Sequence, residues 1–239
     1  VINESCCAGP GYASPQDAIN APREKIVYTV CIYTGTGVDK PDYLATVDVD
    51  ETSPTYSEII HRTELGSGGD ELHHMGWNAC SSCNNDSSMK RKYLIIPGVR
   101  TTNFYIVDTA STPRKPSLFK TINGDEIKAK TNLSGPHTVH CLGSDIIVSM
   151  LGDSDGNGPG GYLHLNKDFE IIGRWENNTQ GMNFSYDFWY QPRHNMMVST
   201  EWAAPNTFMP GFDLNDVSKG NYGQHIHFWD FKNKSIEKS

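Results

Sequence analysis

Short apolar strands that end in Asp or Asn recur along the chain, and this repeat constrains the fold more than any other feature. The pattern covers residues 45–48, 104–108, 162–166 and 226–230, and its end points are 60, 58 and 64 residues apart. A turn and a further strand pattern follow each of the first three. Since repeated groups of three or four strands, each with an acid before a hairpin turn, are typical of β-propellers, we predict an all-β chain with one blade per repeat.

The rest of the chain agrees with a β-rich fold. Helical periodicity is nearly absent, and 22 Gly and 13 Pro break the chain into short segments. The repeat exceeds the usual blade length of about 40–50 residues, so we expect loops to be inserted between strands. The alternative is a β-sandwich whose strand spacing is a coincidence.

Four blades make a small ring, and the chain stops within a strand pattern at residues 236–239. An open propeller would leave unpaired strand edges, which complete propellers protect. We therefore expect residues 1–239 to be a single partial propeller domain. In this interpretation the chain is the N-terminal half of a longer one and holds about four blades of a ring of seven.

Charge and cysteine content narrow the class of protein. The formal net charge of −8 argues against a nucleic-acid binder, which needs a basic face. No apolar run approaches the roughly 20 residues of a membrane helix, and no signal peptide opens the chain. The adjacent Cys6 and Cys7 and the Cys80-x-x-Cys83 pair resemble cytosolic thiols, although six Asn-x-Ser/Thr triplets, Asn3 and Asn85 among them, would allow secretion. We expect a cytoplasmic protein without a transmembrane segment.

Histidines recur where successive repeats enter a strand. They are the adjacent His73 and His74, the pair His137 and His140, and His194. Matching positions in a radial repeat converge on one axis, and imidazole suits copper, zinc or iron. The sequence therefore predicts a shared metal site on this axis.

Residues around the adjacent histidines have less certain roles, and two interpretations of each stay open. A turn at Gly76 would let His73 and His74 reach one ion. Asp70 and Glu71 are either hydrogen-bond acceptors for the imidazole N–H groups or solvated loop charges.

The Cys80-x-x-Cys83 pair has the spacing of zinc knuckles and of thioredoxin-type redox pairs. No second Cys/His pair stands at finger spacing, and no helical pattern follows. Structural thiols, a metal site and a redox pair therefore remain open. We interpret His164, His225 and His227 as sheet-packing residues, and the Asp- and Gly-rich segment 152–161 as a turn, because it lacks the acidic twelfth ligand of a calcium loop.

Several longer motifs carry a family resemblance. They lie at residues 8–12, 41–50, 70–74, 77–83, 186–195 and 199–206. Together they closely resemble the selenium-binding protein family, also known as methanethiol oxidases, from residue 10 to residue 230. Chains of this family are about twice as long, which fits the expected partial propeller.

The resemblance implies an oxidoreductase acting on a sulfur group, which converts methanethiol, O₂ and water to formaldehyde, hydrogen sulfide and hydrogen peroxide. Bacterial members depend on copper held by histidines. Matched by motif, catalytic roles fall on His73, His74 and His140, and metal binding on the same residues with His137, while the role of His194 is less clear. Copper is also the chemically coherent choice, because zinc has no redox chemistry.

The resemblance also implies selenium binding and a cellular setting. In animal members a cysteine binds selenium where this chain has Ser57, which leaves Cys80 and Cys83 as the candidates for selenium or thiol binding. Animal members are cytosolic, nuclear and peripherally associated with membranes, with a role in intra-Golgi transport.

Two other functions compete with the oxidase: a non-enzymatic binding module in transport or redox sensing, and a selenium or thiol carrier. We expect residues 1–239 alone to be inactive, because ligands from the missing half would be lost.

Overall fold

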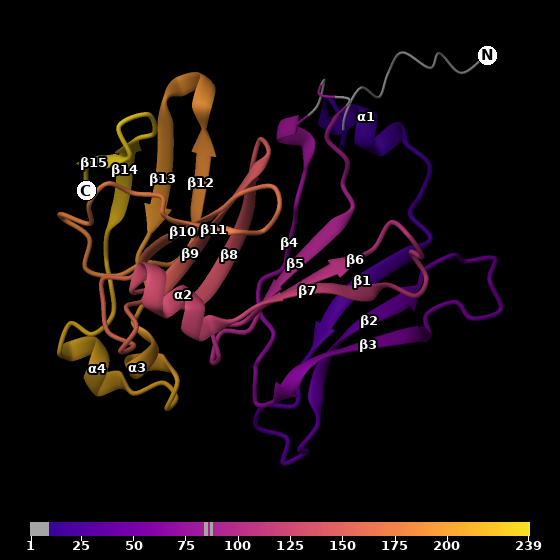
Figure 1. The fold of residues 1–239 in the computed structure, drawn as a ribbon, viewed down its shortest axis with the longest axis horizontal. Helices are drawn as coiled ribbons and strands as arrows, with labels where there is room; N and C mark the ends of the chain where they lie inside the picture. The colour runs from indigo at the N-terminus through magenta and orange to yellow at the C-terminus, as the bar shows by residue number, and fades with distance from the viewer. Residues whose placement is uncertain (1–9, 84–85, 87) are drawn as a thin grey trace.

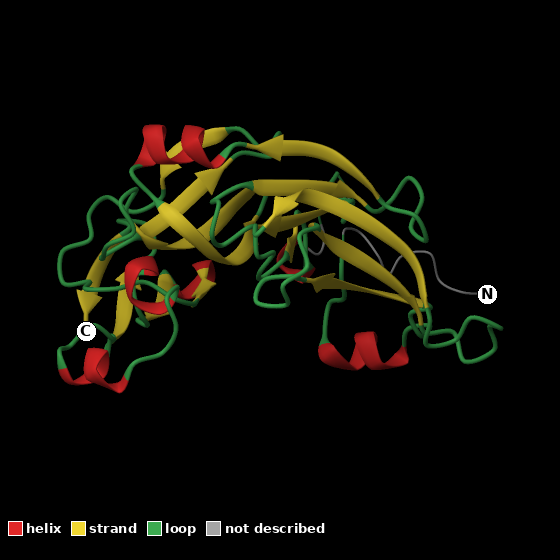
Figure 2. Cartoon of the chain, turned by 90° about the horizontal axis from the view of Figure 1, so that it is seen from below, coloured by secondary structure: helices red, strands yellow, loops and turns green. Residues whose placement is uncertain are grey.

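The computed structural model describes residues 10–83, 86 and 88–239, and its strands form four antiparallel sheets. The sheets follow one another in chain order from indigo to yellow (Figure 1), and they lie along an arc (Figure 2). This arrangement confirms the all-β class and the assignment of one sheet to each repeat. Cys6, Cys7, Asn3 and Asn85 lie outside the described residues.

The first two sheets occupy the N-terminal half of the chain. The first has the order β1-β2-β3 and the second β4-β5-β6-β7, so each is a simple up-and-down meander. Their strands are β1 (Ile26–Cys31), β2 (Pro41–Asp48), β3 (Ile59–Gly68), β4 (Gly76–Trp77), β5 (Tyr93–Pro97), β6 (Phe104–Asp108) and β7 (Ser117–Ile122).

The last two sheets have the same meander order with four strands each. Strands β4, β8 and β12, which begin the three four-stranded sheets, are very short or carry polar residues, and the repeat pattern did not predict them. The strands are β8 (Ser134–Leu142), β9 (Asp145–Gly152), β10 (Gly161–Leu165), β11 (Ile171–Arg174), β12 (Phe188–Gln191), β13 (Met196–Thr200), β14 (Ile226–Asp230) and β15 (Ser235–Lys238).

Helices are short and lie outside the sheets. The longest, α2 (Gly124–Thr131), links the second sheet to the third, and Asn123 caps it by accepting a hydrogen bond from the Asp125 N–H. With eight residues it was too short to give a helical period in the sequence. The others are α1 (Pro15–Asn20), α3 (Pro205–Phe208) and α4 (Leu214–Ser218).

Strands in the middle of the row are buried on both faces. In β5 the side chain of Ile95 packs toward the third sheet, whereas those of Leu94 and Ile96 pack toward the first. In β9, Ile146 and Ile147 likewise belong to two different cores. This is why these strands read as continuous apolar runs and not as an alternation of apolar and polar residues.

The acid that ends each repeated strand holds the following hairpin turn. The Asp108 carboxylate accepts hydrogen bonds from the N–H groups of Ala110 (2.9 Å) and Ser111 (3.0 Å) and from the Ser111 hydroxyl (2.8 Å). Lys92 lies 3.4 Å from the same carboxylate. The side chain thus replaces water as the partner of turn N–H groups, as an Asx turn does.

The equivalent residue does the same in the other three sheets. Asp48, Asp230 and Asn166 each accept backbone N–H groups of the turn that follows, and Asn166 shows that a neutral amide oxygen suffices. The recurring acid of the sequence therefore has a structural role in closing hairpins.

We expect Asp108→Ala to destabilise the protein by about 1–2 kcal/mol, because it leaves the turn N–H groups without their acceptor. Asp108→Asn should cost less than about 1 kcal/mol, since one amide oxygen can still accept, as at Asn166. Urea unfolding followed by tryptophan fluorescence measures both. Equal losses for the two variants would mean that the turn does not depend on this acceptor.

Stability should also fall in acid. Burial alone would raise the pKa of Asp108, but hydrogen bonds from Ser111 and Ala110 outweigh it and lower that pKa. The pKa of Asp48 is lowered chiefly by Ser53, and that of Asp230 by the Asn233 N–H. A lowered carboxyl pKa contributes stability above the ordinary value of about 4, which is lost as pH falls below it. Unfolding temperatures recorded between about pH 5 and pH 2 should drop less steeply for Asp108→Asn than for the unchanged protein.

Candidate metal centre

Three of the predicted histidines meet at one point. One ring nitrogen from each of His73, His74 and His137 lies within 4.8 Å of the others. The ring centroids are 5.1 Å apart for His73 and His74, 4.9 Å for His73 and His137, and 4.1 Å for His74 and His137. We call these residues the histidine trio. Among the described residues no other His, Cys, Asp or Glu joins this cluster.

His137 reaches the trio because β8 is irregular at this point. Pro136 pairs with Met150 of β9 and Val139 with Val148, so one additional residue lies in β8 between these pairs. The Thr138 N–H donates to the Ser149 hydroxyl (2.9 Å) in place of a ladder carbonyl. A bulge of this kind redirects a side chain, and the Thr138 hydroxyl then lies 2.9 Å from His137 Nδ1. The sequence predicted that His137 precedes a strand, whereas it lies within one.

His73 and His74 lie outside any regular strand, so they need not point in opposite directions. The segment enters through Glu71, which has a left-handed φ of 54°. Its backbone is held by the hydrogen bond from the His73 N–H to the Pro97 carbonyl (2.8 Å). As a result the two rings stack with an interplanar angle of 15°.

Gly76 allows the two parts of the trio to approach each other. A Cβ atom at this position would lie only 2.6 Å from the Val139 carbonyl oxygen of β8. The glycine was expected to form a turn but belongs to β4, where its role is the close passage of β4 past β8.

Burial favours the neutral imidazole at His73 and His137. Burial, together with the neighbouring His74 and His73, lowers the pKa of His137 to about 3. Burial and His74 also lower the pKa of His73, which Glu71 partly offsets. His137 is 2% exposed and His73 is half-buried, while His74 faces solvent. Neutral imidazoles have the free lone pair that a metal needs, and the exposed side leaves an entrance.

Tyr186 is a neighbour of the trio that the sequence did not single out. Its ring centroid lies 4.4 Å from that of His137 and 5.3 Å from that of Trp202. Tyr186 lies in the segment before β12, so the chain that leads into the fourth sheet also contributes to the surroundings of the trio. It belongs to the motif at residues 186–195, but nothing in that pattern distinguishes it from the adjacent aromatic residues.

Asp70 and Glu71 differ from each other in role. Asp70 is fully buried and accepts hydrogen bonds from Thr101 and Tyr105. These contacts tie the loop before the trio to the second sheet, so neither the imidazole acceptor nor the solvated charge expected at Asp70 fits its position. Glu71 forms an ion pair with Arg100 and lies near enough to His73 to raise its pKa.

His140 and His194 lie away from the trio. The His140 ring packs edge-on against Phe188 and Tyr190 of β12, on the far side of the third sheet. His194 is exposed in the 3₁₀ turn Pro192–His194, within the β12–β13 hairpin. The structure thus brings together His137, and not its neighbour three residues on, with His73 and His74.

His164, His225 and His227 lie in sheets or beside them, where polar partners hold them. His164 Nε2 is 2.8 Å from Asp145. His225 and His227 both contact the buried carboxylate of Glu201, at 3.0 Å and 3.1 Å.

Cys80 and Cys83 point to different partners. Cys80 Sγ is 2.7 Å from Cys141 Sγ in β8, and the Cys83 thiol donates to the Gly143 carbonyl (3.4 Å). No sequence pattern pointed to Cys141 as a partner, because 61 residues separate it from Cys80. Ser57 is exposed in the β2–β3 turn.

None of the helices in the described part of the chain has the length and apolar character needed to cross a membrane.

Comparison with known proteins agrees with the resemblance. The family model for the 56kDa selenium binding protein matches residues 6–239. Selenium-binding protein 1 of Arabidopsis thaliana is 50% identical over 99% of this chain and 49% of its own length. Methanethiol oxidase of Rattus norvegicus is 54% identical over 95% of this chain and 49% of its own.

A solved structure has the same fold. A hypothetical selenium-binding protein from Sulfolobus tokodaii is 44% identical, with a TM-score of 0.90 over 94% of this chain and 50% of that chain. The chain therefore spans about half the length of the relatives it matches. On these grounds the chain belongs to the 56kDa selenium binding protein family.

Proposed function

We propose that the histidine trio binds copper in a methanethiol oxidase of the relatives' length, of which this chain matches about half. The observation that carries the proposal is the convergence of three imidazoles from two sheets. The rat relative is named a methanethiol oxidase. The reaction that the family resemblance implies converts methanethiol, O₂ and water to formaldehyde, hydrogen sulfide and hydrogen peroxide.

The donor set fits copper. Three imidazole nitrogens within 4.8 Å of one another lie within reach of one ion with bonds of about 2.0 Å after small side-chain rotations. Imidazole accepts copper, zinc, iron and nickel, so the donor atoms alone do not select among them. Copper, when bound, would supply the one-electron chemistry that oxidation of a thiol by O₂ requires and that zinc lacks.

The residues around the trio divide the remaining tasks. The Thr138 hydroxyl lies 2.9 Å from His137 Nδ1. In this proposal it accepts the Nδ1 proton, which fixes the tautomer and leaves Nε2 as the ligand atom. Tyr186 covers one face of the His137 ring and keeps water from it. His74, on the exposed side, borders the route by which a small thiol arrives.

Further parts of the proposal concern the whole protein. The four sheets are the N-terminal blades of a seven-bladed propeller, and the remaining blades close the ring around the trio. The protein is cytoplasmic. The family name implies selenium binding, and because residue 57 is a serine, other thiols of the chain bind the selenium.

In the full-length protein, His73→Ala and His137→Ala should each lower copper affinity at least about 100-fold, since removing a ligand costs no less than disturbing its support. Both should also abolish O₂ uptake with methanethiol. Copper content is measured by mass spectrometry and O₂ uptake with an electrode. His140→Ala and His194→Ala are matched controls that should keep copper, because their rings lie away from the trio.

The outcomes separate the competing functions. If the unchanged protein binds copper but shows no thiol-dependent O₂ uptake, the assignment of the metal centre stands and the oxidase function is rejected. Full copper content and full turnover in both trio variants would show that the site lies elsewhere.

Thr138→Val should weaken copper binding about 10-fold, because it keeps the side-chain shape but removes the acceptor of the His137 Nδ1 proton. Thr138→Ser restores the hydroxyl and should bind copper as the unchanged protein does. Competition titration against a chelator measures both affinities. The tautomer argument fails if Val and Ser bind copper equally well.

A further inference from the structure

Two thiols that are distant in the sequence lie side by side in the structure. Cys80, in the loop after β4, has its Sγ 2.7 Å from Sγ of Cys141 in β8. We propose that Cys80 and Cys141 form a peroxide-sensitive redox pair that closes to a disulfide. This pairing differs from the Cys80–Cys83 bridge that the Cys-x-x-Cys spacing indicates.

The geometry favours this bond. A disulfide is about 2.0 Å long, so the two sulfur atoms need to approach by less than one ångström. Ala79 and Cys83 pack against Cys141, and Cys80 and Met89 pack against the same cluster. The sulfur atoms are therefore held together by their surroundings before any bond forms.

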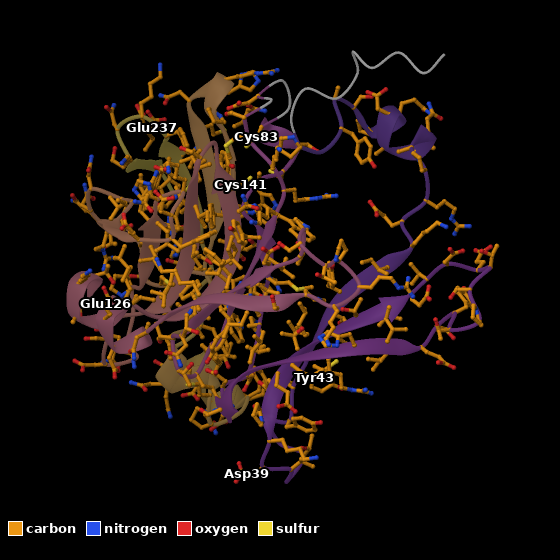
Figure 3. The ribbon with its side chains drawn as sticks, turned by 45° about the vertical axis from the view of Figure 1, so that its right-hand side comes forward. Asp39, Tyr43, Cys83, Glu126, Cys141 and Glu237 are labelled. Atoms are coloured by element: carbon orange, nitrogen blue, oxygen red, sulfur yellow. The ribbon has the colours of Figure 1, made fainter. Side chains whose placement is uncertain are left out.

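Cys83 is directed elsewhere. Its thiol donates to the Gly143 carbonyl in the β8–β9 hairpin at 3.4 Å. Figure 3 shows Cys83 and Cys141 in the same region of the molecule, but the short sulfur–sulfur distance is the one between Cys80 and Cys141.

Exposure sets the order of events. Cys80 is partly exposed, whereas Cys141 is buried and only 2% exposed. A peroxide therefore reaches Cys80 first. The Cys80 thiolate attacks one oxygen of hydrogen peroxide, the O–O bond breaks, and a sulfenic acid and hydroxide form. The Cys141 thiol then attacks the sulfenic sulfur and releases water. In total two thiols lose two electrons, and one peroxide becomes two waters.

The bond would join the two sheets that carry the trio. It connects β8 with the loop that follows β4. Strands β4 and β8 themselves lie beside each other at Gly76 and Val139. Hydrogen peroxide is also a product of the proposed reaction. Only this source of the oxidant depends on the proposed function. The pairing itself does not depend on it.

Peptide mapping of the full-length protein tests the proposal. The protein is treated with hydrogen peroxide in the absence of methanethiol, alkylated, and cut with trypsin under non-reducing conditions. Trypsin places Cys80 and Cys83 in residues 63–90 and Cys141 in residues 131–167. A joined pair of these peptides, lighter by two hydrogens and separated by dithiothreitol, is expected.

Variants identify the partners. Cys83→Ser and Cys31→Ser should still give the joined pair, whereas Cys80→Ser and Cys141→Ser should give none. A bridge within residues 63–90 alone, or loss of the joined pair in Cys83→Ser, overturns the proposal. Because peroxide is added and no methanethiol is present, absence of the disulfide would not count against the oxidase function. Loss of oxidase activity in the histidine variants would not count against the disulfide.

Discussion

The close passage of β4 and β8 is the constraint on which the candidate metal centre depends. At Gly76 the chain has no side chain to hold the strands apart, and the Val139 backbone occupies that space. Two residues before the glycine stands His74, and two residues before the valine stands His137. If the inner strands lay farther apart, the imidazoles of the second sheet could not reach that of the third. A single missing Cβ thus sets the distance between two halves of the site.

The sheets behind this contact act as a rigid support. Strands β5 and β9 are buried on both faces, so each belongs to two packed cores at once. The acids and the amide that end the repeated strands then close the hairpins at the far ends. Neither feature touches the trio, but the core that β5 and β9 share holds the second and third sheets together. Precision at a site requires such support from packing.

The sequence predicted the strands that repeat and the meeting of histidines, because both follow from short-range patterns. It could not choose between His137 and His140, since the additional residue in β8 decides which ring faces the axis, and this bulge has no signature in the sequence of β8. The Cys80–Cys141 contact was also invisible, because the obvious partner, Cys83, stands three residues away. Asp70 looked like a site residue for its place beside the histidines, and only its burial against Thr101 and Tyr105 reveals a structural role.

The bulge in β8 has a consequence for the order of assembly during synthesis. His137 is aimed correctly only when the Thr138 N–H has found Ser149 of β9. A growing chain that has already released His73 and His74 from the ribosome therefore holds two loosely placed imidazoles until β9 follows. Ligands of a folded metal site rarely exist as a set in the unfolded chain. An ion held by all three imidazoles, as proposed, therefore requires that the third sheet has formed.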